Sequence, residues 1–342
     1  MKALPPRVIF LCSTVILLVC ATVFFIYTSV STGISVGELE TGNGQNILYL
    51  GKYDLAIKGQ DKDGITYFFI PSYAEISSIS QDSSMFKLFL TDGRLLTDPR
   101  PGTVQDVNID TGNGEIVPWR VAFMCSDNLY TAFIYIPGAG ADDIDHDIYL
   151  PSELRLYSPF GKLAYSDDSV LLKGRGNTTW EAVKQPYELK LSDSFPLCDM
   201  DSSSKWVLLA NFFDDTKILN KMAMDLSSDI GMEYAIQSDW IDLYINGEYR
   251  GNYLLCKEPG IGKGRLKTKS GFLIEKDIRT SAGESDNVFT VGNNNFKIKD
   301  PYPLSDEKFH AISSYIGRID SEIRDANGDA QIASIDIDSF SK

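Results

Sequence analysis

The stretch "WIDLYINGEYRGNYLL", residues 240–255, decides the fold class because it is the clearest β-hairpin in the chain. Every second residue from Ile241 to Ile245 is apolar, which is the period-two pattern of a strand with one buried face. Asn246 and Gly247 follow, and this pair is typical of a two-residue type I′ turn. The chain returns through "EYRGNYLL". The pattern predicts two antiparallel strands joined by a tight turn.

Strand-like runs separated by turn signals continue on both sides of this hairpin. They include "ITYFFI", "MFKLFL" and "WRVAFM" before residue 125, and "LYTAFIYI", "SELRLYS" and "YELKLS" between residues 128 and 192. Residues 216–230 and 305–324 instead follow the helical period, and Gly231 is expected to stop the first of these helices. The sequence therefore predicts an α+β fold.

The 342 residues suffice for roughly two domains. We expect a signal anchor over residues 1–32, a Gly-, Ser- and Thr-rich linker over residues 33–46, a small β-rich unit over residues 47–125, and a second domain over residues 126–342. The second domain contains the hairpin and both predicted helices.

Residues 8–27 form an uncharged apolar run of the length that spans a bilayer as a helix. Lys2 and Arg7 precede it, so the positive-inside rule predicts a membrane-anchored protein with a cytoplasmic N-terminus and an extracellular bulk. The alternative is secretion after signal cleavage, for which "SVS" at residues 29–31 offers a small-x-small site.

Composition excludes several functional classes. A net charge of −15 argues against nucleic acid as a partner, because no positive excess is present to neutralise phosphates. Five cysteines, two of them inside the apolar run, do not suggest a disulfide framework or a zinc site. His146 and His310 are the only histidines, so histidine-based catalysis is not favoured.

The motif "KGRGNTTW", residues 173–180, places Arg175 between two glycines. Glycines at this spacing suggest backbone that turns with a positive φ or that approaches another group closely. The planar guanidinium suits a phosphate or a carboxylate. The alternative is a strand end leading into a turn, with Arg175 in a structural salt bridge.

Five motifs occur in a fixed order over residues 128 to the end: "GRGNTTW", "KQPYELKL", "KWVLLANFFDDTKILNKMAMDLSSDIG", "IDLYINGEYRGNYLLCKE" and "GFLIEKD". That order resembles the spore coat protein H (CotH) kinase-like family. The resemblance implies a protein-kinase-like N-terminal lobe, an antiparallel sheet with helices, that binds ATP with Mg²⁺ or Mn²⁺. It also implies phosphorylation of serines on spore-coat or cell-surface proteins.

The resemblance also implies roles for individual residues, with the kinase lobe as analogy. Lys190 would pair with phosphate and Asp225 would be its acidic partner; the alternative is an exposed strand lysine and a helix-surface aspartate. Arg175 and Asn177 would orient phosphate or clamp the lobe. Glu275 and Asp277 would border a hinge that holds the adenine; these four residues are further cofactor-binding candidates. No metal ligand is assigned.

The family pattern places its catalytic and metal-binding aspartates after the point that corresponds to Lys342. The expectation is therefore a kinase-like protein that is inactive alone, with a protein substrate or surface partner. The alternative is a non-catalytic, membrane-anchored surface, adhesion or structural binding module. If a further lobe normally covers the last helix, its apolar stripe would be exposed in this chain and would favour aggregation or a partner; the stripe contains Phe309, Ile312, Ile316 and Ile319.

Overall fold

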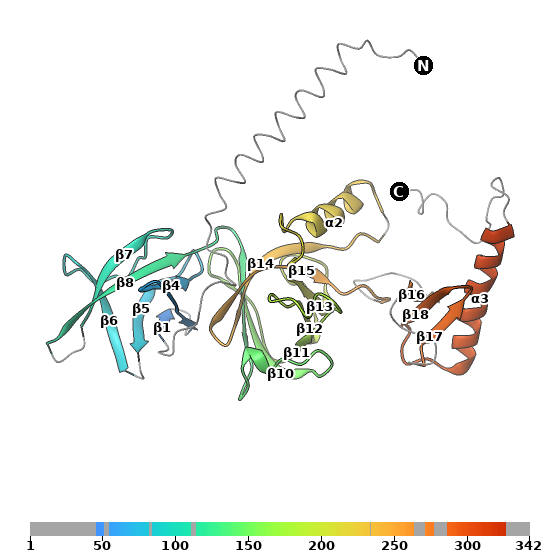
Figure 1. The fold of residues 1–342 in the computed structure, drawn as a ribbon, viewed down its shortest axis with the longest axis horizontal. Helices are drawn as coiled ribbons and strands as arrows, with labels where there is room; N and C mark the ends of the chain where they lie inside the picture. The colour runs from blue at the N-terminus through green and yellow to red at the C-terminus, as the bar shows by residue number, and fades with distance from the viewer. Residues whose placement is uncertain are drawn as a thin grey trace, which may run out of the picture.

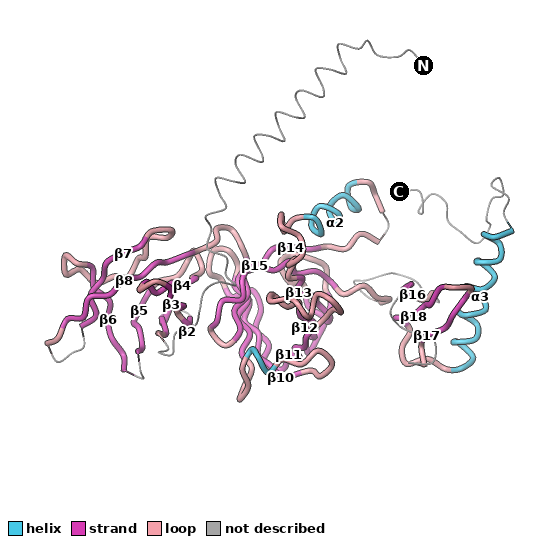
Figure 2. The backbone as a smooth tube through the Cα atoms, viewed as in Figure 1, coloured by secondary structure: helices cyan, strands magenta, loops and turns pink. Residues whose placement is uncertain are grey.

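The computed structural model describes residues 46–50, 55–81, 84–110, 114–232, 234–262, 271–276 and 286–325. The fold is mostly β, and its strands form an eight-stranded sheet, a closed seven-stranded barrel and a three-stranded sheet backed by a helix (Figure 1). Helical structure is confined to two α-helices and a short 3₁₀ turn among these residues (Figure 2).

The first sheet occupies the region predicted as a small β-rich unit. Its strand order is β2-β1-β5-β6-β7-β8-β4-β3. Its strands are β1 (Ile47–Leu50), β2 (Leu55–Lys58), β3 (Gln60–Lys62), β4 (Ile65–Phe69), β5 (Ile76–Gln81), β6 (Ser84–Leu90), β7 (Val104–Asp110) and β8 (Ile116–Met124). Neighbouring strands are antiparallel except β4 and β8, which pair in parallel.

The barrel has the strand order β10-β11-β12-β13-β15-β14-β9. Its strands are β9 (Tyr130–Tyr135), β10 (Leu150–Tyr157), β11 (Leu163–Gly174), β12 (Tyr187–Phe195), β13 (Ser203–Leu209), β14 (Ser238–Ile245) and β15 (Glu248–Lys257). The predicted hairpin is confirmed as β14–β15, and the turn residues Asn246 and Gly247 have φ values of 49° and 79°. The parallel pair β14–β9 closes the barrel.

Alternating side chains fill the barrel. Trp206 of β13 is fully buried, and Tyr187 and Tyr253 of the two neighbouring strands are buried beside it. Because successive strand residues point to opposite faces, the alternate positions of the same strands are left on the outer face. Charged side chains of these strands therefore gather on the outside of the barrel.

The first sheet packs directly on the barrel. Phe69 of β4 stacks on Tyr249 of β15 with ring centroids 4.5 Å apart, and the Tyr244 hydroxyl donates to the Phe69 carbonyl at 2.9 Å. The Lys58 amide also donates to the Gly247 carbonyl of the β14–β15 turn. The two units share a core across this contact, while the predicted boundary at residue 125 stays a prediction.

The third sheet has the order β16-β18-β17, from strands β16 (Leu273–Lys276), β17 (Val288–Val291) and β18 (Asn294–Asp300). The last helix, α3 (Asp306–Asp325), packs on it. Ile312 is buried there, and Phe309 and Ile316 pack against the same cluster. The expectation that this stripe is exposed was therefore wrong, because the sheet covers it.

The predicted α+β kinase lobe with helices was also wrong. Both helices form close to their predicted positions, as α2 (Leu219–Asp229) and α3, but neither lies in the core of the barrel. The α2 helix has no buried residue. When the strands close into a barrel, each strand pairs its backbone groups with two neighbours and the apolar side chains fill the interior. No helix is needed to cover that face of the sheet.

In the part of the chain that the structure describes, no helix is both long enough and apolar enough to cross a membrane. The expectation of a membrane-anchored protein with an extracellular bulk is therefore not met in the described residues. The apolar run at residues 8–27, on which that expectation was based, lies outside the described residues.

Candidate functional site

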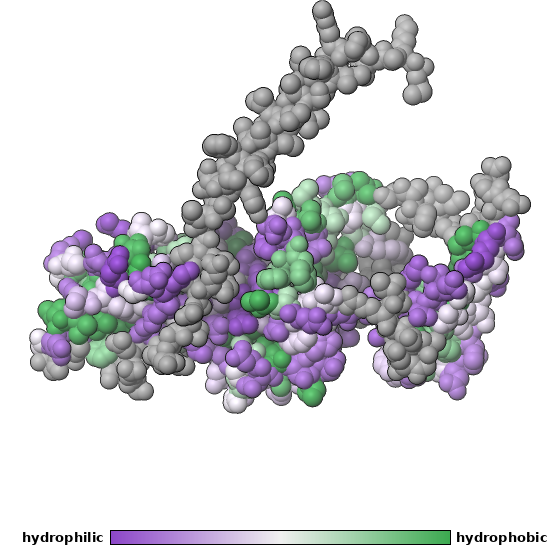
Figure 3. Space-filling model, viewed as in Figure 1, coloured by the Kyte–Doolittle hydropathy of each residue, from purple (hydrophilic) through white to green (hydrophobic). Residues whose placement is uncertain are grey.

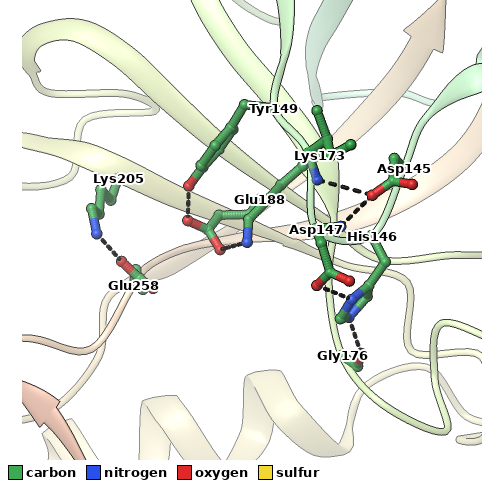
Figure 4. Close-up of polar contacts among 10 residues, drawn as sticks. Asp145, His146, Asp147, Tyr149, Lys173, Gly176, Glu188, Lys205 and Glu258 are labelled. Atoms are coloured by element: carbon green, nitrogen blue, oxygen red, sulfur yellow. Dashed lines mark hydrogen bonds and ion pairs between the residues drawn. The ribbon is translucent and has the colours of Figure 1, made fainter. Parts of the chain in front are cut away.

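The candidate site is the outer face of three adjacent barrel strands, β11, β12 and β13. Leu172, Leu189 and Trp206 of these strands point into the barrel. Their neighbours point outward, and these outward positions carry Lys173, Glu188, Lys190 and Lys205 (Figure 4 shows all but Lys190). Strand alternation thus gathers cations and a carboxylate on one surface. We call this surface the charged face.

A partly desolvated ion pair forms its centre. Lys173 Nζ lies 3.6 Å from Glu188 Oε2 in the neighbouring strand, and the two side chains are 23% and 11% exposed. The Tyr149 hydroxyl donates to the other oxygen of Glu188, and Lys173 Nζ lies 5.0 Å from the Tyr149 ring centroid (Figure 4). Burial and this carboxylate raise the pKa of Tyr149, which therefore remains a hydrogen-bond donor.

Two lysines face each other next to this pair. Lys190 of β12 and Lys205 of β13 are direct register partners, and like charges directly opposite each other destabilise a sheet. Lys205 Nζ is compensated by Glu258 at 3.4 Å. Lys190 is exposed and has no ion pair with any residue in the described ranges. The arrangement leaves one cation of the charged face available to an anion.

The loop after β11 explains the glycines of "KGRGNTTW". A Cβ on Gly174 would lie 2.4 Å from the Trp180 ring, so this position requires glycine to let the indole pack. Gly176 has a φ of 92°, and its carbonyl accepts a hydrogen bond from His146 Nε2 (Figure 4). The Arg175 amide donates to the Pro186 carbonyl, which holds this half-buried arginine at the end of the charged face.

Lys184 ties the far end of the same loop to β15. Its Nζ donates to the Asn252 carbonyl and lies 4.5 Å from the Tyr253 ring centroid. A Cβ on Gly251 would lie 3.3 Å from Lys184 Nζ, so glycine at this position leaves room for the lysine side chain. The Tyr253 hydroxyl donates to the carbonyl of Gln185. These contacts fix the loop on the barrel.

Two charges adjoin this lysine. Burial lowers the pKa of Lys184 to about 8, and the nearby Lys217 lowers it further, whereas Asp242 opposes the shift. Burial in turn raises the pKa of Asp242, which accepts a hydrogen bond from the Tyr249 hydroxyl at 2.9 Å. Keeping Lys184 charged in the folded state therefore lowers the free energy of unfolding.

This cost predicts a pH dependence. The pKa of Lys184 is about 8 when folded and 10.5 ordinarily, so the unfolded chain binds more protons between these values. The free energy of unfolding should therefore gain a contribution on the order of 2 kcal/mol as the pH rises from about 8 to 10.5. Urea titrations of the wild type and of Lys184→Met across this range measure it. The gain should be absent in the variant; equal slopes would contradict the assignment.

The charged face and the loop lie where a known family is matched. The family model described as "CotH kinase protein" matches residues 172–342. The chain belongs to the CotH kinase family. No curated protein matches the chain. The match begins at Leu172, one residue before the ion-paired Lys173, and it includes Lys190, Lys205 and both helices.

In this CotH-family chain the predicted site residues are only partly brought together. Lys190 and Arg175 lie on or beside the charged face, and Asn177 is exposed in the adjoining loop. Asp225 lies on α2 and pairs with Lys221, not with Lys190. Glu275 lies in the third sheet and pairs with Lys299 at 3.2 Å. Asp277 lies outside the described residues.

Sequence reasoning missed the pair formed by Lys173 and Glu188, as well as Lys184. One signal for the pair was present: Lys173 and Arg175 share a strand face, as do Glu188 and Lys190. Pairing the two faces requires the register of β11 against β12, which no local pattern supplies. Lys184 lies in a loop, where no periodicity exists to mark it as partly buried.

The residues of the charged face suit phosphate better than they suit a metal ion. Lysine ammonium groups bind phosphate as point charges. In the described residues, no group of three or more His, Cys, Asp or Glu side chains is placed to hold a metal. The CotH family as a class implies ATP and metal dependence, but no residue of the charged face is assigned to a metal.

Proposed function

We propose that the charged face binds the phosphates of ATP, and that the chain acts in the phosphorylation of protein serines. The observation that carries the proposal is Lys190, an exposed cation directly opposite Lys205 with no ion pair in the described ranges. Without an anion this pairing costs stability, and a bound phosphate would remove the cost. Membership of the CotH kinase family supports ATP as the source of the phosphate.

The residues of the charged face have separate parts in this proposal. Lys190 contacts phosphate oxygens, while Lys205, held by Glu258, adds positive charge beside it. Phosphoryl transfer is catalysed mainly by positioning and by stabilising the charge on these oxygens. Glu188 orients Lys173 through their ion pair, so that the Lys173 ammonium is held on the same surface. Arg175, fixed by its backbone contact with Pro186, adds a planar donor at the edge. ATP, when bound, supplies the phosphoryl group for transfer.

The proposal predicts the effect of removing the exposed cation. ATP titrated into the purified full chain in the presence of Mg²⁺ or Mn²⁺ should bind, and Lys190→Ala should weaken binding by about 10- to 100-fold, the range for a charge-assisted contact. Calorimetry at two salt concentrations measures this, and the loss should be smaller at high salt because the contact is exposed.

The matched control is Lys162→Ala, which removes an exposed lysine from the β10–β11 turn on another part of the barrel. It should leave ATP affinity unchanged. Equal losses in both variants would reduce the effect to net charge and contradict the proposed site. If a folded wild-type sample binds no ATP at all, the kinase assignment fails for this chain, and a non-catalytic binding module takes its place.

A further inference from the structure

The α2 helix is oriented with its apolar face away from the barrel. Its least exposed positions are Lys221, Met224 and Ser227, spaced three residues apart, and they mark the side that faces the barrel. The opposite side is apolar and exposed at these positions: Ile218 46%, Leu219 59%, Met222 56%, Leu226 59% and Ile230 41%. Figure 3 shows hydrophobic surface gathered over this helix. We call these five residues the α2 face.

Charged groups lie on the side of α2 that faces the barrel and at the start of the helix. Lys221 Nζ pairs with Asp225, and the lysine side chain is only 25% exposed. Burial raises the pKa of Asp239 in the adjacent strand β14, and the positive charge of Lys221 opposes that rise. At the start of the helix, Asp214 accepts a hydrogen bond from the Leu219 amide at 2.8 Å. The side of α2 that faces the barrel thus carries a lysine near a strand carboxylate, while its apolar side faces solvent, the reverse of an ordinary surface helix.

Exposed apolar surface of this kind marks an interaction site. The flanking charges indicate the partner. Residues 212–232 contain four aspartates and two lysines, which gives a net charge of −2. A second copy of this acidic surface would be repelled, whereas a basic partner would be attracted. Met222 and Met232 add flexible, adaptable contact area to the surface.

We propose that the α2 face is the docking site for a basic amphipathic helix of a partner protein. Leucine-like side chains at i, i+3, i+4 and i+7 of the partner would cover the α2 face. Lysines or arginines at the flanks of the partner would lie against Asp225 and Asp229. The site is separate from the charged face, and the proposal does not depend on ATP binding.

The test uses the full chain and a fluorescein-labelled helical peptide built from leucine and lysine in that pattern. Fluorescence anisotropy should show binding to the wild type. Leu219→Glu combined with Met222→Glu should weaken it by at least about tenfold, because two contact side chains are lost. Both residues are more than half exposed, so the fold should survive, as circular dichroism would check.

Three comparisons make the result decisive. Phe160→Glu, a change at an 87% exposed residue in the β10–β11 turn, should leave binding intact. A peptide of leucine and glutamate in the same pattern should bind much more weakly; equal binding would overturn the proposal. A wild-type dimer in analytical ultracentrifugation that the double variant dissociates would also overturn it, and would assign the α2 face to a second copy.

Discussion

Replacing Trp206 with alanine should lower the free energy of unfolding by about 3–5 kcal/mol, the range for a large aromatic side chain lost from a packed core. Trp206 is fully buried in the barrel, and its indole Nε1 donates to the Ser203 carbonyl at 2.9 Å. Truncation removes apolar contacts, leaves a cavity and deprives a buried carbonyl of its donor. Urea unfolding followed by circular dichroism gives the number.

The comparison variant is Val183→Ala, at a position that is 74% exposed in the loop after β11. It should change stability by no more than about 0.5 kcal/mol. A Trp206→Ala loss as small as this would mean that the barrel core tolerates the cavity by collapsing. That result would remove Trp206 from the residues that determine the barrel.

Gly251→Val should lower the free energy of unfolding by about 2–5 kcal/mol, the sum of a backbone cost and a lost side-chain contact. Gly251 has a φ of 100°, where a β-branched residue is strained by about 1–2 kcal/mol or more. Its new side chain would also meet Lys184 and displace the ammonium from the Asn252 carbonyl, at about 1–3 kcal/mol. Chemical denaturation of the full chain measures the sum.

A double-mutant cycle separates these two contributions. In a Lys184→Ala background the steric conflict is gone, so Gly251→Val should cost less than in the wild type, by about 1 kcal/mol or more. The backbone strain should remain in both backgrounds. Strict additivity would show that the Lys184 side chain does not pack against Gly251. The glycine would then be needed for its backbone conformation alone.

The hairpin around Asn246 and Gly247 could be predicted because its turn chemistry and its strand period are both local. The closure of the barrel could not, since it depends on the parallel pairing of Ile241 with Tyr130, far apart in the chain. The positions of α2 and α3 followed from helical period. Which side of α2 faces the protein did not follow, because its hydrophobic pattern predicts the side that the structure leaves exposed.

The candidate site shows the same division. Arg175 and Lys190 could be singled out as cations in distinctive motifs. Their place on one surface depends on the register between neighbouring strands, and so does the pairing of Glu188 with Lys173. The expected partner of Lys190, Asp225, is instead held by Lys221 four residues earlier on its own helix, an interaction that helical spacing alone allows.

The closed barrel also bears on where this protein can be divided. The family match begins at Leu172, almost at the end of β11, so it omits β9, β10 and nearly all of β11. A fragment cut at that boundary would leave β12 and β14 as unpaired edges with exposed backbone donors and acceptors, the surfaces through which chains aggregate or swap strands. The segment matched by the family model is thus shorter than the ring of strands, and a fragment for expression should keep β9 to β15 together.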